Sequence, residues 1–493
     1  MRWLGAGLAA AIALAAGAAQ AEKTARDEFS AIAKAMTEGR CDVPRIKALI
    51  ARPDFDDLGG RGRSIVYVAR GLCDRDGQHE AALKATAEPG ALSMAWGLRF
   101  MDAVQRDDMT DALAALHAAA RSPSDQSFQV FNDQTVYGAA RTLRADPARF
   151  RQFLADLDLV GWTAQSAGYE NADWLWSDYA AMLAADGHTE EATRLVLRMA
   201  QLGELAALQL DKRFDAVLAA HPERADVRAA AEARLAWARD KLAANPRDGS
   251  AVSISVDMLR ILGRTDEALA LIDQTLRLSG KIVDHNGEEH RRWLVDDRST
   301  LLVDLGRFDE ALKAMQDAAA RGEHGGPNVS QTINLAGQQQ MMGQPQATLD
   351  TLAVFGGPAA GKTSPYGQMW VEAERACAHH RLGHDDAGAS SLAYVKAHAA
   401  DNPSAQVRAL FCLRDLDGLA AVYIARLKDE VRVREALMEL SQFVMNPVRT
   451  PLDREYSATM ARLRARPDLQ AAVAAVGRLG DFPVHPASMT DAY

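Results

Sequence analysis

The sequence has no excess of positive charge and no run of basic residues. Its 66 Asp and Glu residues outnumber 56 Lys and Arg residues, which gives a net charge of −10 at neutral pH. A protein that holds nucleic acid needs Lys and Arg against the phosphate backbone, so we expect no nucleic-acid partner. The same charge balance argues against attachment to an anionic lipid surface.

Long hydrophobic runs are also absent after the first 21 residues. No later stretch approaches the roughly 20 apolar residues that are needed to span a bilayer. Residues 1–21, MRWLGAGLAAAIALAAGAAQA, hold one positive residue, a short Ala-rich run and a small-x-small ending, which is the plan of a secretory signal peptide. A retained N-terminal anchor is the alternative, and the absence of Cys after Ala21 argues against a lipid anchor. We expect cleavage after Ala21, a periplasmic location and no stable membrane insertion of the mature chain.

Few residues favour β-strands. No run of Val, Ile, Thr and aromatic residues alternates with a period of two, so almost no strand is expected. Ala-rich segments instead recur between Gly, Pro and Asp, and they read as helix, short turn, helix. In one of them Phe308, Ala311, Leu312 and Met315 share a helix face. A helix pair cannot bury such a face alone, so the pattern predicts an all-α stack of pairs, a solenoid.

Two segments resemble the centre of a tetratricopeptide (TPR) repeat. They are LGRTDEALALIDQTL (262–276) and LGRFDEALKAMQDAA (305–319), in which Gly263 and Gly306 each precede an E-A-L run. Looser matches have turn glycines at other positions, and two of them carry Thr348 and Gly388 where the family has Ala: Gly77, Gly187, Gly343, Gly383 and Gly418. The resemblance implies a right-handed, TPR-like superhelix of roughly ten antiparallel helix pairs.

The chain is expected to have four parts along its length. These are a signal peptide (1–21), degenerate N-terminal helical repeats (22–162), TPR-like repeats (163–445), and C-terminal capping helices with a tail (446–493).

The segment GGPAAGKT (356–363) fits the phosphate-binding loop pattern letter for letter. That loop needs a buried strand before it and a helix that opens at its Lys. The preceding QPQATLDTLAVF reads as a helix, and Pro365 and Gly367 follow the motif at once. An exported protein also meets essentially no ATP. We therefore expect an inter-repeat loop and no nucleotide.

Catalytic and metal-binding patterns are missing or weak. CAHHRLGHDD (377–386) gathers possible metal ligands, but Gly383 is expected to end the helix between His380 and His384. HNGEEH (285–290) has its two histidines five apart, which points them away from each other on a helix. There is no G-x-S-x-G and no Cys in the context of a nucleophile. We expect no catalytic residue, no metal and no cofactor, and the protein is not predicted to be an enzyme.

Four cysteines fall into two pairs, Cys41 with Cys73 and Cys377 with Cys412. The members of each pair stand about one repeat length apart, and Cys377 and Cys412 each stand six residues before a turn glycine. Equivalent positions in successive repeats face each other, so an oxidising compartment favours two disulfides. Four free buried thiols are the alternative.

Three tryptophans each stand thirteen residues before a turn glycine: Trp174, Trp293 and Trp370. In the resembled family this part of the first helix borders the concave groove where extended peptides bind. The three rings are therefore hypothesised to line a partner-binding groove, and packing in the core is the alternative.

The predicted function is that of an exported periplasmic scaffold that binds a protein or peptide partner in the cell envelope. The alternative is a helical-superhelix enzyme, or a glycan-binding accessory protein, that acts on cell-wall or polysaccharide material. A cleft with two carboxylates at glycosidase separation would favour the enzyme.

Overall fold

The computed structural model describes residues 24–122, 133–164, 172–284, 287–321, 328–356, 363–447 and 449–489. The chain divides into two compact units, which are treated one at a time below. Unit 1 consists of Met1–Ala167 and Trp174–Met182, and unit 2 consists of Gly168–Asp173 and Leu183–Tyr493. The described part of the chain is an all-α array of helix pairs, with a single short strand pair.

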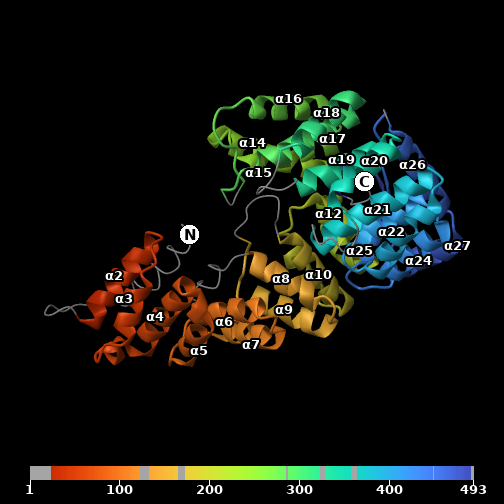
Figure 1. Cartoon of the computed structure of the whole chain (residues 1–493). Helices are drawn as coiled ribbons and strands as arrows, with labels where there is room; N and C mark the ends of the chain where they lie inside the picture. Colours follow the sequence, from red (N-terminus) through yellow and green to blue (C-terminus); the bar gives the residue numbers. More distant parts are fainter. Residues whose placement is uncertain are drawn as a thin grey trace. The chain divides into compact units, whose positions relative to one another are not determined.

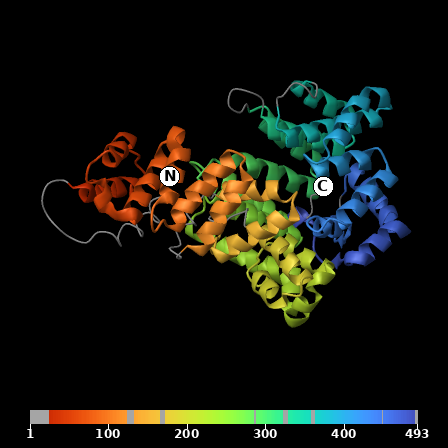
Figure 2. The ribbon, with the colours of Figure 1, turned by 90° about the horizontal axis from the view of Figure 1, so that it is seen from below.

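Unit 1 is a succession of helices that pack on their sequence neighbours (Figures 1 and 2). Its elements are α2 (Ala25–Thr37), α3 (Val43–Ile50), η1 (Phe55–Leu58), α4 (Gly59–Cys73), η2 (Arg75–Gly77), α5 (Gln78–Ala87), α6 (Ser93–Gln105), α7 (Met109–Arg121), α8 (Asp133–Leu143), α9 (Pro147–Leu159) and most of α10 (Asp173–Ala185).

The helices of unit 1 begin at residues that satisfy their free backbone N–H groups. Thr24 caps α2 in a capping box with Asp27, and Asp42, Asp108 and Asp146 each accept a hydrogen bond from a backbone N–H of the first turn. Each such cap stabilises its helix by about 1 kcal/mol. The punctuation by Asp and Pro seen in the sequence therefore corresponds to real helix starts.

Unit 2 begins with short helices and continues as regular pairs. Its elements are α11 (Thr189–Val196), α12 (Leu202–Leu210), η4 (Lys212–Phe214), α13 (Asp215–Ala220), η5 (Pro222–Ala225), α14 (Val227–Ala244), α15 (Gly249–Ile261), α16 (Thr265–Leu276), α17 (Arg291–Asp304), α18 (Phe308–Ala319), α19 (Val329–Met341), α20 (Pro345–Leu352), η6 (Ala353–Phe355), α21 (Pro365–Arg381), α22 (Asp385–Ala397), α23 (Pro403–Cys412), α24 (Leu416–Leu427), α25 (Val433–Leu440), β1 (Gln442–Phe443), α26 (Pro451–Arg464), α27 (Pro467–Val476), β2 (Asp481–Phe482) and η8 (Ala487–Met489).

The two best TPR-like segments form helix pairs with the expected turn. Gly263 and Gly306 both have φ = +74°, a left-handed conformation that glycine adopts without steric cost. The Ala of each E-A-L run, Ala268 or Ala311, is fully buried. A small side chain at this point lets the second helix lie close to the first.

The less regular pairs keep the same crossing with other small residues. Thr348 is fully buried, and its hydroxyl lies 3.3 Å from the carbonyl oxygen of Ala336 on the preceding helix. Gly388 is buried as well, and a Cβ atom there would lie 3.0 Å from the Cβ of His379. Thr and Gly therefore replace Ala without opening the crossing.

Two of the expected turn glycines have other roles. Gly418 lies inside α24, where its N–H donates to the Asp415 cap at 2.8 Å, and the left-handed turn residue is Arg414 with φ = 57°. Gly77 precedes α5 with φ = −99°, so it is not a left-handed turn. The expected left-handed glycine is therefore absent at both turns. Arg414 with the Asp415 cap replaces it before α24, and the 3-10 helix Arg75–Gly77 leads into α5.

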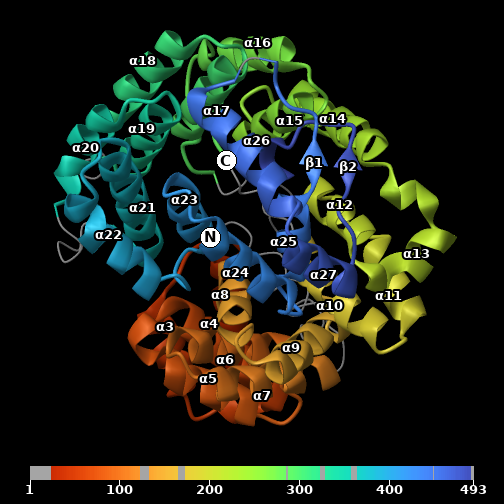
Figure 3. The same cartoon turned by 90° about the vertical axis from the view of Figure 1, so that its right-hand side faces the viewer.

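The C-terminal part of unit 2 returns into the array. Figure 3 shows α25, α26 and the strand pair inside the arc formed by α12 to α21. Strands β1 and β2 pair in parallel, with Gln442 opposite Asp481 and Phe443 opposite Phe482. Helix α25 packs against α12, and η8 packs against α15. The last described residues, up to Met489, thus form part of the inner surface of unit 2.

Candidate functional site

The inner face of unit 2 holds a cavity of about 410 Å³. Helices α15, α17, α19 and α21 form one side of it, and the segments around Met445–Asp453 and His485–Ala487 form the other. A cavity of this size is within the range of small-molecule and side-chain binding pockets. Its lining is mixed in character, with aliphatic, amide, charged and aromatic side chains.

Helical spacing explains why these residues share the cavity. On α19 the lining residues recur every three or four positions: Ile333, Asn334, Gly337, Gln338 and Met341. On α21, Trp370 and Glu374 are four residues apart. Residues at these spacings lie on one face of a helix, so each of these helices turns a single face to the cavity.

Gly337 has no side chain and therefore leaves space in the cavity next to Glu374. It lies in the interior of α19, where glycine costs about 1 kcal/mol relative to alanine. A Cβ atom at Gly337 would lie 3.8 Å from Glu374 Oε1, so a larger side chain there would extend toward the Glu374 carboxylate.

Two ion pairs lie in the cavity wall. Arg260 Nε is 2.9 Å from Asp304 Oδ2, and the side-chain amide of Asn446 donates to Asp304 Oδ1 at 2.8 Å. Arg408 Nε is 3.0 Å from Glu374 Oε1, and the side chain of Glu374 is almost completely buried. The second oxygen of Glu374, Oε2, has no hydrogen-bond partner in the described structure.

Among the acidic residues that line the cavity, Asp296 has the fewest stabilising contacts. Its Oδ2 accepts a hydrogen bond from the side-chain amide of Gln331 at 2.8 Å, but its Oδ1 is buried without a partner among the described residues. Burial raises the pKa of Asp296 to about 6, and the favourable interactions with Gln331 and Asn334 offset only part of the desolvation. A carboxylate in this position gains from any cation that reaches it.

A second buried acid adjoins it on α17. Asp297 Oδ2 accepts a hydrogen bond from Ser253 at 3.1 Å, and burial raises the pKa of Asp297 to about 7. Ser253 also lies 3.1 Å from His290 Nε2. In a hydrolase triad the serine contacts the histidine, and the histidine contacts the acid. Here Ser253 lies between His290 and Asp297 and contacts both, so the group does not have the order of a Ser–His–Asp triad.

The C-terminal tail begins at Leu479, and its described residues, up to Met489, form the opposite wall of the cavity. The backbone N–H of His485 donates to the carbonyl of Ile261 at 3.0 Å, and Ser488 hydrogen-bonds through its backbone N–H and its hydroxyl to the Asp257 carboxylate. Burial lowers the pKa of His485, which favours the neutral imidazole. Phe482 and Val484 are buried in the core of unit 2.

The structure places the three predicted groove tryptophans in different surroundings. Trp370 is half-buried, packs on the cluster around Met369 and lines the cavity. Trp293 is 38% exposed, with the Arg292 guanidinium 5.4 Å from its ring centroid, and it is not among the described residues that line the cavity. Trp174 lies in unit 1.

Trp174 is held between two side chains of unit 1. The Arg144 guanidinium lies 4.6 Å from its ring centroid, and the ring of Tyr137 lies 5.9 Å away. Arg144 also pairs with the buried carboxylate of Asp178 at 2.5 Å. Of the three hypothesised positions, only Trp370 borders the described cavity.

Both predicted cysteine pairs are at bonding distance. The Cα atoms of Cys41 and Cys73 are 5.5 Å apart, and those of Cys377 and Cys412 are 5.3 Å apart. The first pair joins the start of α3 to the end of α4, and the second joins α21 to α23. Because Cys412 precedes Arg414 rather than a turn glycine, the positional argument from Gly418 did not apply to it.

The phosphate-loop motif has the neighbours of an inter-repeat loop. Residues 357–362, Lys362 included, lie outside the described residues. Upstream stand α20 and η6, and downstream Ser364 caps α21, which begins at Pro365 and not at the motif's Lys. A phosphate-binding loop needs a strand before it and a helix that opens at the Lys, so the flanks do not fit one.

The two histidine-rich segments serve local structure where they are described. His380 Nδ1 lies 2.7 Å from Asp385, and Gly383 ends α21 between His380 and His384 with φ = 73°. His285 lies outside the described residues, and His290 forms the N-cap of α17. Among the residues that the structure places, no three His, Cys, Asp or Glu side chains form a metal-binding group.

The comparisons with known proteins give limited guidance. No family model matches the chain, and no curated protein matches it. Similar solved structures include the APC/C hetero-tetramer Cut9–Hcn1 (13% identity, 92% of this chain and 90% of that chain, TM-score 0.29). They also include the P58(IPK) TPR domain (12%, 79% and 98%, 0.20) and Naa15/Naa10 bound to HypK-THB (13%, 92% and 79%, 0.24). With TM-scores this low, the fold assignment rests on the helix pairs described above.

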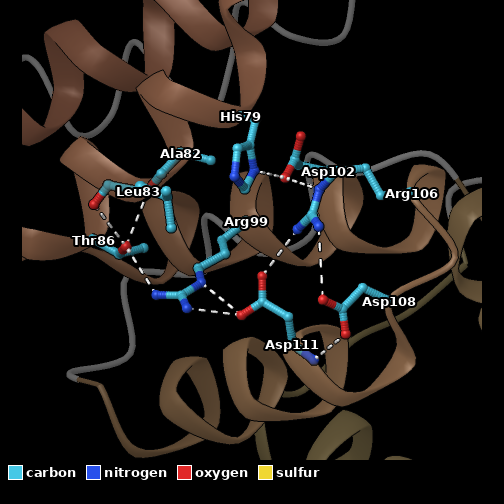
Figure 4. Close-up of polar contacts among 9 residues, drawn as sticks. All are labelled: His79, Ala82, Leu83, Thr86, Arg99, Asp102, Arg106, Asp108 and Asp111. Carbon is cyan, nitrogen blue, oxygen red and sulfur yellow. Dashed lines mark hydrogen bonds and ion pairs between the residues drawn. The ribbon is translucent and has the colours of Figure 1, made fainter.

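Unit 1 has a polar network of its own, which joins three helices (Figure 4). His79 of α5 and Arg106 of α6 both contact Asp102, at 2.8 and 3.0 Å. Arg99 and Arg106 both reach Asp111 of α7, at 2.7 and 3.2 Å. Every carboxylate in this group has partners, so the network ties α5, α6 and α7 together and offers no open site.

Sequence reasoning missed Asp296, Gly337 and the tail as cavity residues. Periodicity places Asp296 on α17 and Gly337 on α19, but only the fold shows that their faces meet. The tail gave no signal in the sequence, because its return into unit 2 depends on contacts with α12 and α15. No helix in the described ranges is both long and apolar enough to cross a membrane.

Proposed function

We propose that the protein is an exported, periplasmic TPR-like scaffold, whose unit 2 binds an extended segment of a protein or peptide partner in the cell envelope. The observation that supports this best is the cavity of about 410 Å³ on the inner face of its helix pairs. Helical repeat proteins create concave surfaces of this kind from their stacked helices.

The lining suits a peptide. Aliphatic side chains and Trp370 offer apolar contact, and Asn334, Gln338 and Asn446 offer amides that can bond to a peptide backbone. Polar groups at fixed positions in a pocket set the orientation of a ligand, and an aromatic ring supplies contact area at low entropic cost.

The same inner face already holds an extended segment of this chain. The backbone N–H of Gln442 donates to Gly480 at 2.9 Å, and that of Val444 donates to Val484 at 2.9 Å. This is the geometry by which extended peptides add to a strand edge. An incoming segment would lie beside the tail, where His485, Pro486 and Ala487 form a wall of the cavity.

Export is supported by residues 1–21 and by the paired cysteines, because disulfides persist in oxidising compartments. Mass spectrometry of the mature protein should find Glu22 at its N-terminus in the envelope fraction. A mature chain that begins at Met1 and stays in the cytosol would contradict the proposed location.

The binding function can be tested by site-specific photo-crosslinking in the envelope fraction. A photoreactive amino acid in place of Met341, which lines the cavity, should give a discrete covalent adduct. The same amino acid in place of the exposed Gln316 on α18 serves as the control. Gly337→Leu, which fills the cavity, should abolish the adduct at position 341. Equal adducts at positions 341 and 316 would contradict a cavity-specific partner.

No enzymatic function is proposed. A glycosidase needs two carboxylates available across a cleft. In the described cavity Asp304 and Glu374 are paired with arginines, and Asp453 caps α26. Asp296 is the one lining acid that has neither an arginine partner nor a helix-capping role among the described residues.

A further inference from the structure

We propose that the cavity of unit 2 binds a positively charged side chain, a lysine or an arginine of the partner. Its aliphatic part would lie against Trp370, and its charged end would pair with Asp296 and with the free oxygen of Glu374. This inference rests on the proposed function and deepens it, because it names the chemistry by which the partner is recognised.

The first support is the pair of carboxylate oxygens without partners. Asp296 on α17 and Glu374 on α21 both line the cavity, and each has one buried oxygen with no hydrogen-bond partner in the described structure. Glu374 is only 2% exposed, so contact with bulk water at the outer surface does not replace the missing hydrogen bond. A buried acceptor that is left unpaired costs about 1–3 kcal/mol, and a ligand ammonium or guanidinium would remove that cost.

The two acids flank the same helix. Gln331 of α19 donates to Asp296, and the position of a Cβ at Gly337, also on α19, lies 3.8 Å from Glu374 Oε1. The arc in Figure 3 shows α17, α19 and α21 in this order. Because Gly337 has no side chain, no bulky group at this position of α19 separates the two acids.

The acidic side of the cavity has too few cations of its own. Arg260 pairs with Asp304 at 2.9 Å, and its positive charge also acts on Asp257 and Asp297. Arg292 is the cation that acts on Asp296. Asp257, Asp296 and Asp297 form no ion pair with any described residue. Desolvation raises the pKa of all three carboxyls, so a further positive charge on this side would be favoured.

The cations of the other side are already engaged. Arg408 pairs with Glu374 Oε1, and Arg449 donates to the Ser457 hydroxyl and the Asp453 carbonyl. Burial lowers the pKa of His485, which favours its neutral form. Arg449 is the lining cation without a carboxylate partner, so an acidic ligand is the competing possibility that the experiment must separate.

Trp370 completes the site. It is four residues before Glu374 on α21 and shares its cavity-facing side. The stem of Lys or Arg packs well on an indole ring, and the face of the ring attracts the positive end.

Calorimetric titration of the mature chain tests the inference with three peptides. They are acetyl-Gly-Leu-X-Leu-Gly-amide with lysine, norleucine or glutamate at X. At pH 8 the lysine peptide should bind at least tenfold more tightly than the norleucine peptide. Asp296→Asn, which keeps the size and an acceptor for Gln331, should remove most of this advantage and leave the norleucine peptide unchanged. Asp309→Asn, an exposed acid on α18, is the matched control and should change nothing.

The advantage of lysine should also fall as the pH is lowered from 8 to 5. Asp296 has a pKa of about 6 and Asp297 of about 7, so both carboxylates take up protons in this range. The other titratable or charged groups around them are Arg260 and Asp257 from α15, Arg292 and Asp304 from α17, His485 from the tail, and His290, which contacts Asp297 through Ser253. A lysine advantage that does not depend on pH would contradict the role of these acids.

The remaining outcomes are distinct. Equal binding of the lysine and norleucine peptides would overturn the cation inference and leave peptide binding intact. Tightest binding of the glutamate peptide would overturn it in favour of Arg449. If no peptide binds to the wild-type chain, both this inference and the proposed function are wrong. Loss of all three peptides in a folded Asp296→Asn variant would show that Asp296 maintains the cavity and does not read charge.

Discussion

Arg478 forms a two-pronged ion pair with Asp215, at 2.6 and 2.7 Å, across 263 residues of the chain. Beside it, the backbone N–H of Arg478 donates to the carbonyl of Leu210 at 2.8 Å. The segment after α27 is thus bonded to α12 and α13, near the start of unit 2. In an open solenoid each repeat stabilises only its neighbours. Here the two ends support each other, so unit 2 is expected to unfold as one cooperative body.

Removal of the tail, residues 479–493, should therefore destabilise the whole of unit 2. The deletion takes away Phe482, Val484 and Met489, which are at least 90% buried in its core. Burial of a large apolar side chain contributes about 1.5–3 kcal/mol, so the loss in free energy of unfolding should reach about 5 kcal/mol. Urea denaturation followed by circular dichroism measures it. Arg478→Ala is the control, and because its ion pair is half exposed it should cost less than about 1 kcal/mol. An unchanged urea midpoint in the truncated chain would contradict this closure.

The two cysteine pairs should differ in their response to reduction. Cys377 and Cys412 are both buried, whereas Cys41 is exposed. Mild reductant on the native protein should open Cys41–Cys73 first, and the other pair should need denaturant. Peptide mapping after alkylation distinguishes the pairs, and four alkylatable thiols in the untreated exported protein would contradict both bonds.

Loss of each bond should also cost stability locally. The pairs close loops of 32 and 35 residues, which corresponds to about 3–4 kcal/mol in the loop-entropy description. Cys41→Ala with Cys73→Ala should affect unit 1, and Cys377→Ala with Cys412→Ala should affect unit 2. Hydrogen exchange by mass spectrometry locates the loss.

The three tryptophans should separate in thermal melts of single alanine variants. Trp174 is held by Tyr137 and Arg144, so its replacement should cost about 3 kcal/mol in unit 1. Trp293 is 38% exposed, and its loss should change stability by less than about 1 kcal/mol. Trp370→Ala should weaken partner binding by about thirtyfold, the usual effect of losing an aromatic anchor. Large drops in melting temperature for all three would contradict the groove hypothesis at every position.

The helix pairs could be predicted from the sequence because their determinants are local. The turn glycines at 263 and 306, the E-A-L runs and the Asp caps all act within one helix or one turn. The cysteine pairs followed from the repeat length, which the fold preserves even where the turn residue changes from glycine to Arg414.

The candidate site could not be predicted in the same way. Its acids and Gly337 come from separate helices, and the cavity exists only because the tail returns to α15. That return depends on long-range contacts such as His485 to Ile261, for which no local pattern exists. Of the three tryptophans that stand thirteen residues before an expected turn glycine, only Trp370 lines the cavity. The position of a residue along a helix determines the face on which its side chain lies, but not which other helices pack against that face.

Asp297→Asn should stabilise the protein at pH 8. Burial raises the pKa of Asp297 to about 7, against about 3.9 for an unfolded Asp. The folded state therefore holds this proton more tightly than the unfolded state does. The free energy of unfolding should fall as the pH rises from about 4 to 7, by about 1.4 kcal/mol per unit of pKa difference. Asparagine does not ionise and still accepts a hydrogen bond from Ser253, so the variant escapes this loss of stability at pH 8 and has no advantage at pH 4.

Urea denaturation at both pH values measures the difference in free energy of unfolding. Asp304→Asn, which weakens the ion pair with Arg260, is the matched control and should be destabilising at pH 8. An Asp297→Asn variant that is less stable than the wild type at pH 8 would show that the carboxylate is held by attractions that outweigh its burial.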